Sequence, residues 1–178
     1  MAELIPDQEP QAGLPRSGPV ALFAKIVTWW GIFGGLVFSV LVLMSIVSIV
    51  GRKLFSTPIE GDMELLMMGA AVGSAAFLAV CELEDHHIKV DALTTWMSVQ
   101  ARAVLDTLAH ALLMIASAVL TWRTALYVEE SFQNTEVSPL MLIPVWQPVA
   151  LMVPSFVLLT LAAAYRVMVS LDIARGRP

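Results

Sequence analysis

Four long apolar stretches make up most of this chain of 178 residues, and three of them contain no charged residue. Hydrophobic residues account for 58% of the sequence and charged residues for only 14%, whereas charged residues make up roughly a quarter of a typical soluble domain. A water-soluble core of this size has too little interior to hide so much apolar surface. The sequence therefore predicts an integral membrane protein of the all-α class.

The lengths of the stretches predict four membrane-spanning helices. Val27–Val50 has 24 uncharged residues, and as a helix it reaches about 36 Å, enough to cross a hydrocarbon core with some tilt. Leu65–Cys81 has 17 uncharged residues, close to the lower limit for a span. The third span covers about residues 107–126 and the fourth about residues 145–165. Four crossings place both termini on the same side of the membrane.

The distribution of Lys and Arg predicts which side that is. Seven cations fall in the N-terminal tail, the second loop and the C-terminal tail, against three on the opposite side. Because translocation of short basic loops is disfavoured, we expect both termini in the cytoplasm. Residues 1–19 are rich in Pro and Gly and lack the basic start of a secretory signal, so we expect a disordered tail there. A transmembrane domain over residues 20–170 and a cytoplasmic tail over 171–178 follow it.

The loop between the second and third spans carries a helical apolar stripe. Its members recur at spacings of three, four and seven residues: Val90, Leu93, Met97, Val104 and Leu108. Such a stripe predicts an amphipathic interfacial helix over about residues 90–106. It either lies along the membrane surface or continues into the third span as one long helix, and we favour the surface arm.

Small residues make up nearly half of the second span. Gly69 and Gly73 are four residues apart, as are Gly31 and Gly35 in the first span. Such pairs let helix backbones approach closely in lipid, so we expect a tight seam between the first two helices. Pro154 lies inside the fourth span and predicts a bend there, static rather than hinged.

The chemistry-bearing residues do not form a recognisable reaction centre. Residues 81–91 hold many metal-capable side chains, but consecutive residues such as His86 and His87 point in different directions on any regular element, so we expect no metal or other cofactor. No phosphate-binding loop and no Ser/His/Asp arrangement is present. The net charge is −5, without a basic cluster, which argues against nucleic-acid binding. We nominate no catalytic residue and do not expect an enzyme.

His110 lies inside the third span, where an ionisable side chain is costly. A hydrogen bond to a neighbouring helix is the role we expect for it. The alternative is a haem-binding membrane anchor of a respiratory oxidoreductase, in which His110 and a second histidine hold the haem. A freestanding four-helix structural protein is a third possibility.

Motifs at the ends of the four spans resemble those of one known family. After the first span comes Arg52-Lys53-Leu54-Phe55, and before the second come Pro58, Gly61, Asp62, Glu64 and Leu65. The second span is followed by His87-Ile88-Lys89-Val90-Asp91. Ser138-Pro139 and Ile143-Pro144-Val145-Trp146 precede the fourth. In order and spacing these motifs resemble the small membrane subunit of tripartite ATP-independent periplasmic (TRAP) transporters.

This resemblance implies a function in solute uptake across the bacterial inner membrane. The small subunit would bind a large permease that carries the solute and ion sites, and would enlarge the fixed part of its elevator mechanism. A periplasmic solute-binding protein would deliver an organic acid, and an ion gradient, usually sodium, would drive transport. The residues we expect at the partner interface are Arg52, Gly61, Asp62, Glu64, His87, Asp91, Pro144 and Trp146. Arg52 and Glu64 are expected to bridge to each other or to the partner.

Overall fold

The chain forms long helices and no sheet in the part that the structure describes. The computed structural model describes residues 18–55, 59–84 and 99–175. Its helices, in chain order, are α1 (Pro19–Phe55), α2 (Asp62–Leu83), α3 (Val99–Gln133) and α4 (Trp146–Ala174). All four are long and apolar enough to cross a membrane. The predicted all-α class and the four transmembrane helices are thus confirmed.

The helices extend beyond the apolar runs from which they were predicted. α1 has 37 residues and α3 has 35, which corresponds to more than 50 Å each at about 1.5 Å per residue. α2, with 22 residues, is the shortest. The last turn of α1 contains Arg52 and Lys53, whose positive charges suit the negative end of the helix dipole. Charge therefore ends the membrane span without ending the helix.

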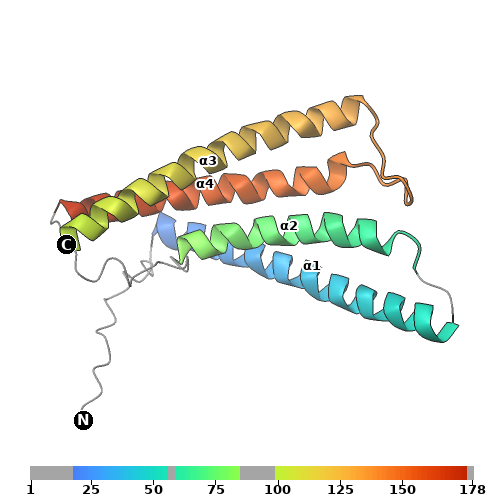
Figure 1. Cartoon of the computed structure of the whole chain (residues 1–178). Coiled ribbons are helices and arrows are strands. Elements are labelled where there is room, and N and C mark those ends of the chain that lie inside the picture. The colour runs from blue at the N-terminus through green and yellow to red at the C-terminus, as the bar shows by residue number, and fades with distance from the viewer. Residues whose placement is uncertain (1–17, 56–58, 85–98, 176–178) are drawn as a thin grey trace, which may run out of the picture.

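The four helices lie side by side in the order α1, α2, α4, α3 (Figure 1). α2 and α4 occupy the centre of this array and are its most buried spans. Their shared seam is built from small side chains, among them Ala75 and Ala79 of α2 and Ala162 of α4. Val27 of α1 packs against the same cluster. α1 also reaches α4 directly, because Trp30 Nε1 donates a hydrogen bond to Ser155 Oγ at 2.8 Å.

The predicted glycine seam between α1 and α2 is confirmed, with one change of residue. A Cβ atom added to Gly34 would lie 2.8 Å from the Cβ of Ala76 and 3.1 Å from the carbonyl oxygen of Gly73. A Cβ added to Gly35 would meet only the ring of Phe77, at an ordinary 3.7 Å. Gly34 rather than Gly35 is therefore the α1 residue at the point of closest backbone approach.

The segment predicted as an interfacial helix falls only partly within the described residues. Residues 99–106 form the first turns of α3 and run without a break into the third span. For these residues the single long helix, and not the surface arm that we favoured, is correct. Residues 85–98 lie outside the described part of the chain, so the surface arm remains a prediction there. Pro154 lies inside α4, which continues on both sides of it.

Candidate partner-binding end of the bundle

Asp62 joins the end of α1 to the start of α2. Its Oδ2 accepts a hydrogen bond from the buried Ser48 hydroxyl at 2.5 Å and lies 3.3 Å from Nη2 of Arg52. Its Oδ1 accepts a hydrogen bond from the backbone N–H of Met63 at 2.8 Å. A carboxylate in the first turn satisfies an otherwise free N–H group and suits the positive end of the helix dipole. One side chain thus fixes the α1–α2 corner.

Glu64, also in the first turn of α2, holds the loop between α3 and α4. Its Oε2 accepts hydrogen bonds from Ser138 Oγ at 2.7 Å and from the Met141 N–H at 3.1 Å. Its Oε1 accepts one from the Leu140 N–H at 2.9 Å. Hydrogen bonds to a charged acceptor are shorter and stronger than those between neutral groups. Glu64 therefore ties the α3–α4 pair to the α1–α2 pair.

Gly61 precedes α2 at a position that strongly favours glycine. Its φ of 76° lies in the left-handed region, which side chains with a Cβ rarely adopt. A Cβ added there would also overlap the side chain of Met141. The loop between α3 and α4 consequently packs directly onto the backbone at the start of α2.

The α3–α4 loop is also hydrogen-bonded within itself. The Ser138 N–H donates to the Ile143 carbonyl at 2.9 Å, and the Val145 N–H donates to the Glu136 carbonyl at 3.0 Å. The Glu136 carboxylate accepts hydrogen bonds from Tyr127 at 3.2 Å and from the buried Ser131 at 3.1 Å. These bonds connect the loop to the last turns of α3 and give it a defined shape.

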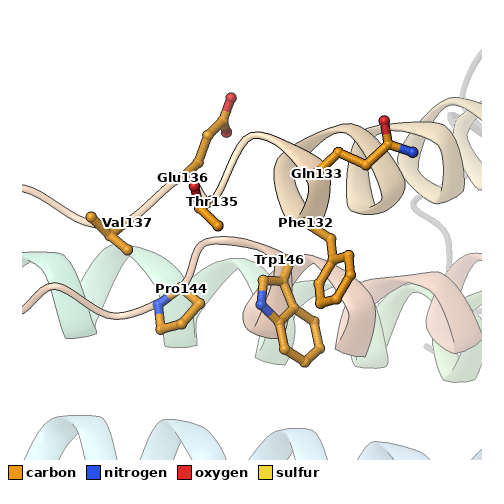
Figure 2. A pocket seen from close by; sticks show the side chains of 7 residues that line it. All are labelled: Phe132, Gln133, Thr135, Glu136, Val137, Pro144 and Trp146. Atoms are coloured by element: carbon orange, nitrogen blue, oxygen red, sulfur yellow. The ribbon is translucent and has the colours of Figure 1, made fainter.

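A mainly apolar cavity of about 400 Å³ lies beside this loop. The rings of Phe132 and Trp146 meet edge to face, with centroids 5.6 Å apart. Figure 2 shows the two rings next to each other between the end of α3 and the start of α4, with the Glu136 carboxylate directed away from them. The cavity is lined by Phe132, Gln133, Thr135, Glu136, Val137, Pro144 and Trp146. Such a recess suits an apolar group rather than a charged one.

Six of the eight predicted interface residues come together at this end. They are Arg52, Gly61, Asp62 and Glu64 at the α1–α2 corner, and Pro144 and Trp146 at the cavity. His87 and Asp91 lie outside the described residues, as does most of the polar stretch after the second span. Within the described chain Arg52 forms an ion pair with Asp62, and Glu64 binds the α3–α4 loop. Arg52 and Glu64 therefore do not form the bridge to each other that was one of the two predicted arrangements.

Sequence reasoning missed four residues that build this end. Ser48 lies one helical turn before Arg52, a spacing that places both on one face of α1. Glu136 is an acidic residue in a short, largely apolar loop, which is a weak signal for its hydrogen bonds to Tyr127 and Ser131. Ser138 belongs to the Ser138-Pro139 motif before the fourth span, but no function was predicted for it. Met141 carried no signal, since its contact with Gly61 depends on the fold of the loop.

A second polar cluster lies near the other end of the array. Nδ1 of His110 in α3 and Oε1 of Glu82 in α2 are 2.7 Å apart, and the Glu82 side chain is fully buried. Arg166 Nε of α4 donates to the Glu82 backbone carbonyl at 3.3 Å. The expected hydrogen bond from His110 to a neighbouring helix is therefore confirmed. The cluster connects three helices.

Comparison with known proteins places the chain in a family. A family model described as "Tripartite ATP-independent periplasmic transporters, DctQ component" matches residues 41–172. That range runs from the middle of α1 through most of α4 and contains both polar clusters. No curated protein sequence and no solved structure matches the chain. Because the matched range covers well over half of the 178 residues, the chain belongs to the DctQ family, the small permease subunits of TRAP transporters.

Proposed function

We propose that this chain braces the large permease of a TRAP transporter in the bacterial inner membrane. The large permease would bind and move an organic acid that a periplasmic binding protein delivers, and a sodium gradient would drive the transport. The observation that carries this proposal is the family match over residues 41–172. The chain would supply a fixed support and no transport site of its own.

The arrangement of the helices supports a bracing role. Helices placed side by side leave wide apolar faces open, and many large apolar side chains of α1 and α3 are exposed. Polar side chains inside the array hydrogen-bond to other helices, as Trp30 does to Ser155 and Thr160 to Ser117. Cross-links of this kind stiffen a membrane bundle. A stiff array with broad apolar faces suits a support against which a partner's mobile part slides.

Purification from native membranes in a mild detergent tests the proposal. We expect a large membrane protein of the permease class to co-purify with the tagged chain in a one-to-one ratio, as measured by native mass spectrometry. Recovery of the chain alone, or with a haem protein and a Soret absorption band, would overturn the proposal. The same experiment with Asp91→Ala tests whether the segment after the second span contacts the partner.

We also propose that both termini lie in the cytoplasm and that the Glu64 end of the array faces the periplasm. The chain has one cysteine, Cys81, so a Cys81→Ser background allows single labelling sites. Lys53→Cys and Arg175→Cys place exposed thiols at opposite ends of the array. A membrane-impermeant maleimide should label the first variant once the outer membrane is opened, and the second only after the inner membrane is also broken. The reverse pattern would invert the topology.

A further inference from the structure

Arg123 carries a charge on the exposed side of a membrane-spanning helix. It lies inside α3, and its neighbours one turn away on the same side are the exposed apolar residues Val119 and Leu126. Within the residues that the structure describes, its guanidinium makes no hydrogen bond or ion pair. A guanidinium in apolar surroundings is costly unless an acceptor is present. Arg123 therefore requires an acceptor that the described residues do not supply.

The depth of Arg123 in the membrane follows from the contact between α2 and α3. Glu64 and Glu82 bound the uncharged run of α2 and lie about 27 Å apart along it. α3 is aligned with α2 at His110, whose Nδ1 lies 2.7 Å from Glu82 Oε1. Arg123 lies about 20 Å further along α3, and so about 7 Å short of the level of Glu64. Of the described charged residues, Arg123 alone lies well between these two levels. Its long side chain can turn toward the nearer boundary, as arginines near the ends of spans do.

Two aromatic residues flank Arg123 at this level. Trp122 is 67% exposed, and Tyr127, one turn further along α3, is 42% exposed. Tryptophan and tyrosine are enriched at the boundary between lipid tails and headgroups. α3 lies at the edge of the array and packs mainly against α4 (Figure 1). The exposed side of α3 near Arg123 thus has the composition of a surface that meets lipid headgroups.

Phosphate is the acceptor that suits Arg123 best. A guanidinium donates two parallel N–H bonds to a phosphate group, and lipid phosphates lie at the boundary that this side chain can reach. A carboxylate of a partner protein at the depth of Arg123 would itself have to leave water, and burial of a second charge is costly. The position of Arg123 therefore favours a lipid phosphate over a carboxylate.

A carboxylate lies further out on the same side of α3. Arg123, Tyr127 and Glu130 follow one another at spacings of four and three residues, which place them on one helix face. Glu130 is exposed and lies about 10 Å beyond Arg123 toward the end of α3. Positive charge thus precedes negative charge on the way out of the membrane. In a phosphatidylethanolamine headgroup the phosphate lies inside and the ammonium group outside, which is the complementary order. Phosphatidylglycerol offers no cation to Glu130, and the quaternary ammonium of phosphatidylcholine has no N–H to donate.

We propose that Arg123 and Glu130 form a binding site for one phospholipid with a primary-amine headgroup, of the phosphatidylethanolamine class. Arg123 binds the lipid phosphate, and Glu130 accepts hydrogen bonds from the ammonium group. The acyl chains then run along the apolar side of α3, past Val119. The site does not depend on which permease the chain braces. It leaves this side of α3 to lipid, so the partner contacts other faces of the array.

Lipid binding to the full-length chain, counted by native mass spectrometry, tests the site. The chain is offered phosphatidylethanolamine, phosphatidylcholine or phosphatidylglycerol with identical acyl chains. The wild-type chain should hold one phosphatidylethanolamine at least about fivefold more tightly than either other lipid, and Arg123→Gln should weaken that binding by at least about fivefold. The matched control is Lys53→Gln, which removes an exposed cation at the same end of the array and should change the affinity by less than about twofold. Both variants should keep the thermal stability of the wild-type chain, since both side chains are exposed.

Glu130→Gln tests the choice of headgroup separately from the phosphate contact. This variant should bind phosphatidylethanolamine and phosphatidylcholine equally, because only the ammonium contact is lost. Glu129→Gln neutralises the adjacent exposed carboxylate, which lies on a different helix face, and should keep the wild-type preference. Loss of the preference in both variants would overturn the role of Glu130.

Four outcomes would overturn the lipid site while leaving the proposed function intact. One is equal binding of the three lipids to the wild-type chain. Another is unchanged phosphatidylethanolamine binding in Arg123→Gln. The third is displacement of the lipid by millimolar inorganic phosphate, which would show that any phosphate anion suffices. The fourth is a weaker complex between Arg123→Gln and the co-purified permease with an unchanged lipid count, which would assign Arg123 to a carboxylate of that partner.

Discussion

Alanine at the neighbouring glycines 34 and 35 should have opposite effects on stability. A Cβ at Gly34 would lie 2.8 Å from the Cβ of Ala76, about 0.6 Å short of ordinary contact, and 3.1 Å from the backbone oxygen of Gly73. That oxygen belongs to a helix backbone and cannot turn away as a side-chain end does. The two helices must therefore separate, and overpacking of this kind costs about 1–3 kcal/mol.

Gly35→Ala is the matched control, because its Cβ would make only one contact, at 3.7 Å. Both substitutions gain about 1 kcal/mol of helix propensity, which cancels in the comparison. Gly34→Ala should therefore be about 1–3 kcal/mol less stable than Gly35→Ala. Reversible unfolding in mixed micelles, followed by tryptophan fluorescence, measures the difference. Equal stability of the two variants would refute a backbone seam between α1 and α2.

Further predictions concern the two polar clusters and the alternative function. Arg52→Gln should lower the free energy of unfolding by less than about 1 kcal/mol, because the ion pair is exposed. Asp62→Ala should lower it clearly more, since it leaves the buried Ser48 hydroxyl without its acceptor; equal losses would contradict this. Glu82→Leu and His110→Leu should each destabilise the chain by about 3–5 kcal/mol, and the double variant by clearly less than their sum; simple additivity would show that the pair does not act as a unit. The purified complex should show no Soret band, and a band of one haem per chain would favour the oxidoreductase anchor.

The existence of the four helices could be predicted from the sequence, but their full lengths and neighbours could not. The length of an uncharged run indicates which part of a helix crosses the hydrocarbon core of the membrane. The helix itself continues past that core as long as its backbone hydrogen bonds are made. Arg52 therefore ends the charge-free run but lies inside α1. The order α1, α2, α4, α3 depends on which helix faces with small side chains fit together. The GxxxG pattern predicted Gly35 at the contact between α1 and α2, whereas Gly34 is the residue that lies there.

The candidate site was predictable as a set of residues but not as a geometry. Motifs at the ends of spans identified Glu64, and helical spacing cannot show that it binds a hydroxyl group 74 residues further along the chain. The left-handed backbone of Leu142 likewise has no sequence signature, because leucine is not a residue that turns favour. The hydrogen bond of His110 could be predicted, because a buried histidine requires a hydrogen-bond partner. The sequence did not show that the partner is Glu82.

Reconstitution into proteoliposomes tests most directly whether this chain braces a carrier and does not carry solute itself. With the large permease, the periplasmic binding protein and an inward sodium gradient, vesicles that contain this chain should accumulate a radiolabelled organic acid, and vesicles that lack either membrane subunit should not. Accumulation by vesicles containing this chain alone, or full uptake by the large permease without it, would contradict a bracing role.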